Sequence, residues 1–162
     1  MQLITIRQST LEDAREWLRM RREFWPHCSD EEHALEIERI ARGDCGVVFV
    51  AERESAGLCG FAELSIRHDH VEGASAAPVA YLEGWYVDAD MRGREVGRQL
   101  LASAEQWAAE RGFRELASDA RLSNEQGIRA HRACGFAEAS RLVHFIKPLR
   151  ASAGLRNSVQ PK

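Results

Sequence analysis

Two acidic residues occupy positions that could serve proton chemistry in the second half of the chain. Glu83 lies within the apolar run 79–87, and Asp119 directly follows a second strand-like stretch at 113–118. A carboxylate within reach of an ammonium group can accept its proton, and a second carboxylate can hold the cation. Two such carboxylates are able to bind an amine together. A strand carboxylate facing water and an aspartate capping a turn are the structural alternatives.

A histidine is the next candidate for chemistry. His131 falls in 124–134, a short segment with helical spacing that ends before Gly135. An imidazole can donate a proton to a departing group near neutral pH. A lone histidine on a short helix is more often a core or surface residue, so both interpretations stay open.

A turn rich in arginine and glycine joins a predicted buried strand to a predicted helix. Residues 92–98 read RGREVGR. Backbone N–H groups of such a turn, at the start of a helix, can bind a pyrophosphate. No Gly-Lys-Ser/Thr follows, so the turn is not a P-loop. Glu95 would repel a phosphate unless it faces solvent or pairs with Arg94 or Arg98. A helix with an ordinary acidic first turn is the structural alternative.

Composition limits the class of protein. The 162 residues are 44% hydrophobic and 29% charged, as expected for one globular domain. A net charge of -3 argues against nucleic acid as the main partner and suits a cationic substrate. The four cysteines are scattered, which predicts reduced thiols rather than disulfides or a zinc site. No apolar run could span a bilayer and no signal peptide is visible, so we expect a cytoplasmic protein with no membrane partner.

Alternating and helical patterns indicate the elements that would position these residues. Strands are predicted at 3–7, 46–53, 58–67, 79–87, 113–118, 137–139 and 142–147. Helices are predicted after Thr10, from a capping box at Ser29 to near Gly43, from Val96 to before Gly112, and at 124–134. This order predicts an α/β (α+β) domain over residues 1–148. The polar tail, 149–162, is expected to be flexible.

Both the element order and two motifs resemble the GNAT N-acetyltransferases. The turn at 92–97 is similar to that family's acyl-CoA loop, Arg/Gln-x-x-Gly-x-Gly/Ala, although Arg94 and Glu95 stand where the first required glycine is usual. The segment from Asn124 to Phe136 is similar to Asn-x-x-Ala-x-x-x-Tyr-x-x-x-Gly-Phe, with Gly127 for Ala and His131 for Tyr. The resemblance implies a mixed, mostly antiparallel sheet, flanked by helices and splayed at its central strands.

Five shorter segments resemble a narrower group, the aminoglycoside 6'-N-acetyltransferases. They are FWP at 24–26, GFAE at 60–63, YLEGWYV at 81–87, ASDA at 117–120 and HRACGF at 131–136. The resemblance implies an acceptor site formed by Trp25, His70, Glu83 and Asp119. His70 departs from the pattern, because relatives tend to have tyrosine in that loop. Packing is the alternative role for Trp25, and an exposed loop is the alternative for the cluster His68-Asp69-His70, which lacks a third metal ligand.

The same resemblance implies transfer of acetyl from acetyl-CoA to the 6'-amine of an aminoglycoside by direct attack, which confers resistance to the antibiotic. Glu83 would be the base and His131 the donor to the departing sulfur. The residues expected to bind the co-substrate are Trp85, Tyr86, Val87, Arg92, Gly93, Arg94, Glu95, Val96, Gly97, Arg98, Asn124 and His131. We expect a homodimer and no metal. The alternatives are an acetyltransferase for another amine, such as a polyamine or a protein N-terminus, and a non-catalytic CoA-binding module.

Overall fold

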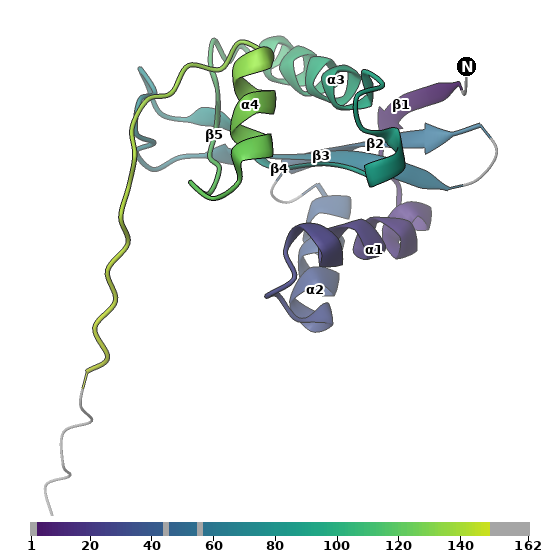
Figure 1. The fold of residues 1–162 in the computed structure, drawn as a ribbon, viewed down its shortest axis with the longest axis horizontal. Helices are drawn as coiled ribbons and strands as arrows, with labels where there is room; N and C mark the ends of the chain where they lie inside the picture. Colours follow the sequence, from purple (N-terminus) through teal and green to yellow (C-terminus); the bar gives the residue numbers. More distant parts are fainter. Residues whose placement is uncertain (1–2, 44–45, 55–56, 150–162) are drawn as a thin grey trace, which may run out of the picture.

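A five-stranded sheet with helices on both faces forms the body of the protein (Figure 1). The structure, a computed structural model, describes residues 3–43, 46–54 and 57–149. The strands are β1 (Ile4–Gln8), β2 (Gly46–Arg53), β3 (Leu58–Arg67), β4 (Val79–Val87) and β5 (Leu116–Ser118). The helices are α1 (Ala14–Phe24), α2 (Asp30–Ala41), α3 (Val96–Glu110) and α4 (Glu125–Ala133), with short 3-10 turns η1 (Leu11–Asp13) and η2 (Ala89–Met91).

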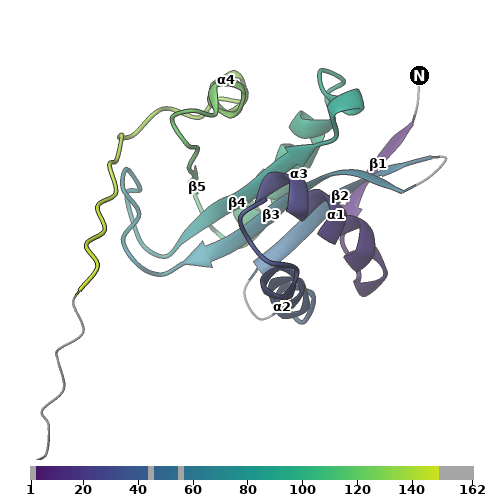
Figure 2. The same ribbon diagram turned by 60° about the horizontal axis from the view of Figure 1, so that its bottom comes forward.

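The strands follow one another across the sheet in chain order. The pairs from β1 to β4 are antiparallel, and β4 pairs with β5 in parallel. The parallel ladder runs only from Ala80–Leu116 to Leu82–Ser118, although β4 continues to Val87. The two strands therefore diverge beyond Leu82, with α4 following β5 (Figure 2). The predicted mixed sheet with splayed central strands is confirmed.

A bulge interrupts the pairing of β3 with β4. Glu63 faces Gly84 and the next residue, Leu64, faces Leu82, so Glu83 has no partner across the ladder. An extra residue of this kind bends the strand and turns its side chain to a new direction. The bulge stands beside the point where β4 and β5 begin to separate.

Apolar side chains with helical spacing cover both faces of the sheet. On one face, α3 buries a stripe against β2, β3 and β4 that consists of Val96, Leu100, Leu101, Ala104, Trp107 and Ala108. On the other face, Trp17 and Met20 of α1 and Ile37 of α2 pack against Val50 and Phe61. The capping box predicted for α2 is present, since Ser29 accepts from the Glu32 N–H at 3.2 Å. No helix in the described part of the chain is long and apolar enough to cross a bilayer.

Two strand predictions near the end of the chain are wrong. Residues 137–139 and 142–147 form no strand in the structure; the segment 137–149 runs away from the body (Figure 1). Apolar and polar residues alternate in this segment as they do in a strand. A strand, however, forms only where its backbone N–H and C=O groups can hydrogen-bond to a neighbouring strand. Phe145 and Ile146 are 90% and 94% exposed. The strand predicted at 113–118 is shorter, at 116–118, and the first helix opens with the η1 turn.

Several predictions fall on residues that the structure does not describe. The tail predicted to be flexible lies outside the described residues except for Leu149. Of the residues between β2 and β3, only Glu54 and Gly57 are described.

Candidate functional site

The bulge residue Glu83 is held by two side chains of β3. Arg67 donates from Nε to Oε1 at 2.9 Å and from Nη2 to Oε2 at 2.6 Å, and the Ser65 hydroxyl donates to Oε1 at 2.5 Å. The Glu83 side chain is 29% exposed, so its carboxylate is held in place but reachable from solvent. Hydrogen bonding to Glu83 raises the pKa of Arg67. Such a two-point ion pair fixes the plane of the carboxylate.

Tyr81 connects this ion pair to Asp119. The guanidinium carbon of Arg67 lies 3.4 Å from the centre of the Tyr81 ring, and the Tyr81 hydroxyl donates to Asp119 Oδ1 at 2.7 Å. Burial, and then the bond to Asp119, raise the pKa of Tyr81 well above its usual value, so the phenol keeps its proton. The two predicted carboxylates therefore belong to one connected group, the Glu83–Arg67–Tyr81–Asp119 group.

Trp25 packs against β4 beside that group. A Cβ on Gly84 would lie 2.5 Å from the Trp25 ring, so the glycine allows the indole to approach the strand. Trp25 also covers the buried Arg21 guanidinium, whose carbon lies 4.6 Å from the ring centre. Arg21 is paired with Glu63 and Glu36, and burial raises the pKa of Glu63. Trp25 thus packs on β4 at Gly84, and its predicted role in acceptor binding stays a prediction.

His70 lies apart from these residues. It is on the loop between β3 and β4, its side chain is 80% exposed, and its Nε2 lies 3.6 Å from Glu72. Among the described residues, no hydrogen bond or ion pair joins it to Glu83 or Asp119. Its role in acceptor binding stays a prediction.

The turn before α3 has the backbone shape expected of an anion site. Gly93 and Glu95 both have positive φ, of 73° and 65°, and the first helical residue is Val96. Glu95 is the N-cap, yet in the described structure its side chain makes no capping hydrogen bond to the helix. Its carboxylate, 66% exposed, pairs instead with Arg98 at 2.9 Å, the arrangement that limits repulsion of a phosphate. The N–H groups of the first turn are thus left available.

Trp85 packs against the first turn of α3. Its indole Nε1 donates to the Gly97 carbonyl at 3.0 Å, and a Cβ on Gly97 would lie 3.3 Å from the ring. Gly97 therefore lets β4 and α3 pack closely at this point. A larger residue there would force the helix away from the strand.

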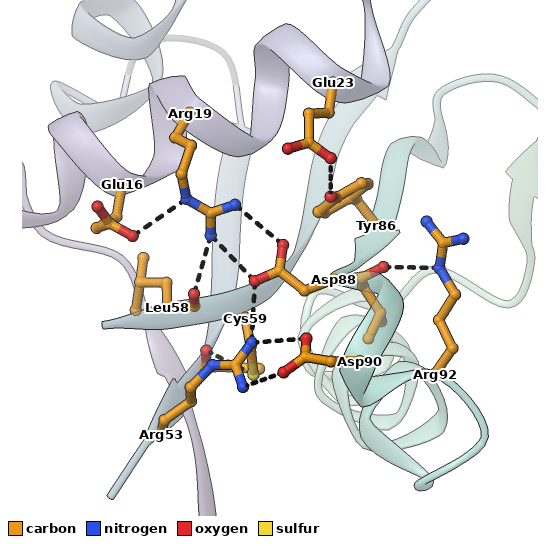
Figure 3. Close-up of polar contacts among 12 residues, drawn as sticks. Glu16, Arg19, Glu23, Arg53, Leu58, Cys59, Tyr86, Asp88, Asp90 and Arg92 are labelled. Carbon is orange, nitrogen blue, oxygen red and sulfur yellow. Dashed lines mark hydrogen bonds and ion pairs between the residues drawn. The ribbon is translucent and has the colours of Figure 1, made fainter. Parts of the chain in front are cut away.

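An arginine–carboxylate network fixes the other end of the turn (Figure 3). Asp88, the first residue after β4, is bound by Arg19 of α1 at 3.0 Å and by Arg53 of β2 at 3.1 Å. Arg92 donates from Nε to the Val87 carbonyl at 3.0 Å. These contacts tie the start of the turn to two other elements, although the residue types alone did not indicate them.

The diverging part of β4 carries Tyr86 and Val87. In the described structure, β4 beyond Leu82 has no partner strand on the β5 side, so backbone groups on that edge face the opening. The Tyr86 hydroxyl is turned elsewhere, because it donates to Glu23 at 2.6 Å (Figure 3). The predicted contact of Tyr86 with the co-substrate would thus involve its backbone.

His131 stands on the other side of the opening. Its ring lies edge-on to Trp85 and Phe136, with centroids 5.4 Å and 5.0 Å away. Its Nδ1 is 2.7 Å from the Gly127 carbonyl and its Nε2 is 3.0 Å from the Ser118 hydroxyl. Sequence reasoning missed Ser118, which has no motif of its own and reaches His131 only through the chain reversal between β5 and α4.

Asn124 caps the helix that carries His131. Its side-chain oxygen accepts from the Gly127 N–H at 2.9 Å. An asparagine at this position stabilises the first turn, and here it also places the Gly127 carbonyl that binds His131. The direct contact predicted between Asn124 and the co-substrate stays a prediction.

Comparisons with known proteins agree with this geometry. The acetyltransferase (GNAT) family matches residues 11–136. A protein of Stenotrophomonas maltophilia named aminoglycoside N(6')-acetyltransferase type 1 is 45% identical over 149 residues, covering 92% of this chain and 96% of that protein. A protein of the same name from Salmonella enteritidis is 36% identical over 142 residues, covering 88% of this chain and 97% of its own length.

Solved structures show the same fold with ligands. Aminoglycoside N-acetyltransferase AAC(6')-Iy in complex with CoA superposes with a TM-score of 0.85 at 34% identity, covering 92% of this chain and 97% of that one. The same protein in complex with a bisubstrate analogue, CoA-S-monomethyl-acetylneamine, has a TM-score of 0.84 at 35% identity, covering 91% and 99%.

Proposed function

The chain belongs to the GNAT family of acetyltransferases, and we propose that it transfers the acetyl group of acetyl-CoA to the 6'-amine of aminoglycosides, as an antibiotic-resistance enzyme. The relatives named for this activity cover nearly the whole chain. The observation that carries the proposal is the position of Glu83. A bulge takes this carboxylate out of the β3–β4 ladder, and Arg67 and Tyr81 join it in one connected group to Asp119.

The acceptor side of the opening suits a polycation. Glu83 and Asp119 offer carboxylate oxygens that can receive charge-assisted hydrogen bonds from ammonium groups. An amine must lose a proton before it can attack a thioester, and Glu83 accepts that proton directly or through water. Asp119 holds a further ammonium, while Arg67 and Tyr81 keep the two carboxylates in place.

The co-substrate side is formed by the turn before α3 and the free edge of β4. The N–H groups at residues 93–98 would bind the pyrophosphate of acetyl-CoA, with Arg92, Arg94 and Arg98 supplying positive charge. A backbone N–H near Tyr86 or Val87 would polarise the thioester oxygen. The amine then attacks the carbonyl carbon directly, the carbon–sulfur bond breaks, and the sulfur takes up a proton.

A homodimer is part of the proposal. Large apolar side chains on the segment 137–149 are exposed in the single chain, namely Leu142, Val143, Phe145, Ile146 and Leu149. An extended segment with unpaired backbone groups can add to a sheet of a second copy. β5 is the edge strand on that side of the sheet, with its outer edge free among the described residues.

A cytoplasmic location also belongs to the proposal. Cys28, Cys59 and Cys134 are free thiols, which fits a reducing compartment. The net charge of -3 supports a cationic small molecule as partner rather than a nucleic acid.

Product analysis tests the proposed reaction at atomic level. Neamine is incubated with the protein and acetyl-CoA, and the product is examined by NMR. Acetylation of the 6'-nitrogen supports the proposal. Acetylation at another nitrogen would keep the acetyltransferase and overturn the assigned regiochemistry.

A further inference from the structure

Ser118 has no role in the reaction proposed above. It is the last residue of β5 and pairs with Leu82, where β4 and β5 begin to diverge. Its hydroxyl lies 3.1 Å from the Leu82 carbonyl and 3.0 Å from His131 Nε2. Both neighbours can accept a hydrogen bond, yet a serine hydroxyl has a single proton to donate.

The protonation of His131 decides which of the two neighbours receives the Ser118 proton. The Gly127 carbonyl can only accept, so the ring hydrogen is on Nδ1, 2.7 Å away. In neutral His131, Nε2 is then a bare acceptor and takes the Ser118 proton, which leaves the Leu82 carbonyl without its hydrogen bond from Ser118. In the imidazolium form, Nε2–H donates to Ser118 and Ser118 donates to Leu82. All three contacts are hydrogen bonds only in that form.

The helix end and the contacts of the ring determine where the protons of His131 can go. His131 lies in the last turn of α4, where the helix dipole favours a cation. The ring is flanked by the uncharged side chains of Trp85 and Phe136, and its two nitrogens meet Gly127 and Ser118. Neither nitrogen is directed to an open position, so a proton that leaves the ring on the β5 side passes to Ser118.

We propose that Ser118 delivers the proton taken up by the departing CoA thiolate and that His131 replaces it. This inference rests on the proposed function. As the carbon–sulfur bond breaks, the sulfur keeps the electron pair and takes the hydroxyl proton of Ser118. At the same time Nε2–H of His131 transfers its proton to Ser118 Oγ, leaving a neutral imidazole. A proton from solvent, in balance with the one released by the amine, then restores the imidazolium.

Substitution of Ser118 tests the relay. We expect Ser118→Ala to lower kcat about 100-fold, the lower end of the range for loss of a proton donor. The affinity for CoA and the unfolding temperature should change little. Ser118→Thr keeps the hydroxyl and suits a strand, so it should restore most of the rate. Ser103→Ala, a serine on the half-buried side of α3, is the matched control.

A proton inventory separates proton transfer from structural support. In mixtures of H2O and D2O, the rate of the wild type should follow a curved plot, because two protons move together. The plot for Ser118→Ala should be straight. A rate for Ser118→Ala equal to that of Ser103→Ala would overturn the relay, and so would an unchanged curved plot in a slow Ser118→Ala variant.

A measurement without substrate distinguishes failure of the relay from failure of the proposed function. Nitrogen NMR of labelled histidine in the ligand-free protein should show His131 with a hydrogen on both ring nitrogens, and an Nε2 signal that moves in Ser118→Ala. An unmoved Nε2 signal would overturn the contact itself. Absence of acetyl transfer to any amine, with the Nε2 signal moved, would overturn the proposed reaction and with it the delivery step, while supporting the contact.

Discussion

Arg67 binds both oxygens of Glu83, with Nε 2.9 Å from Oε1 and Nη2 2.6 Å from Oε2, while its guanidinium lies against the ring of Tyr81. Because Tyr81 also binds Asp119, the two acidic residues of the proposed acceptor site are held by the same pair of side chains, Arg67 and Tyr81. A substitution in this group is therefore expected to affect binding of the amine as well as its deprotonation. The effects of substitutions at residues in one such network are not additive.

Removal of the Glu83 carboxylate tests its role as base. We expect Glu83→Gln to lower kcat about 100-fold or more at neutral pH, because the amide cannot accept the ammonium proton. Affinity for CoA should be retained, since the turn before α3 is untouched. Glu105→Gln on the exposed side of α3 is the control. Steady-state rates and calorimetry measure both effects, and an unchanged kcat would remove Glu83 from the mechanism.

Glu95 combines a strained backbone with an unfavourable charge. We expect Glu95→Gly to raise the free energy of unfolding by about 0.5 kcal/mol, because glycine accepts a φ of 65° without the penalty of other residues. It should also tighten CoA binding about threefold by removing a partly screened negative charge. Glu95→Gln should show the second effect without the first. If both variants bind CoA as the wild type does, the carboxylate does not influence the phosphates.

The ion pair between Asp13 and Arg7 should make the free energy of unfolding depend on pH in acid. Bonds from Arg7 at 2.7 and 2.8 Å, and the Thr10 N–H, lower the pKa of Asp13 below 3.8. The stability it contributes is therefore complete above pH 3.8 and is lost as the pH falls through the lower folded-state pKa. Asp13→Asn should cost about 2 kcal/mol at pH 7. Urea unfolding should show this gap closing in acid, and a gap independent of pH would contradict the assignment.

The exposed apolar side chains of the segment 137–149 lead us to expect a dimer in solution. We expect the wild type to sediment as a dimer, and the double variant Phe145→Asp, Ile146→Asp to sediment as a monomer, because it places charges on the two most exposed apolar side chains of the segment. Leu35→Asp, at an exposed leucine of α2, should leave the dimer intact. A monomeric wild type, or a dimeric double variant, would refute the proposed pairing.

Sequence patterns predicted the elements well where the physical signal is local. The apolar stripe of α3 and the capping box at Ser29 depend on residues three or four apart, and both are present. The resemblance to the GNAT family added the splay between β4 and β5, which no local pattern contains.

The details of the site depend on contacts between distant segments. Alternation marks β4 as a strand but cannot show that Glu83 is the bulge, because the bulge depends on the register with β3. Arg67 is sixteen positions from Glu83 and Ser118 is thirteen from His131. The strands predicted at 137–139 and 142–147 were wrong for a related reason, since alternation indicates a strand without indicating a partner.

Acetyl-CoA-dependent thiol release with matched aminoglycosides tests whether the protein acetylates a 6'-amine. Each pair would contain one compound with a 6'-amine and an otherwise similar compound with a 6'-hydroxyl. We expect thiol release only with the amines, because Glu83 and Asp119 are proposed to bind and deprotonate an ammonium at that position. Equal release with both members of a pair, or release with neither, would contradict it.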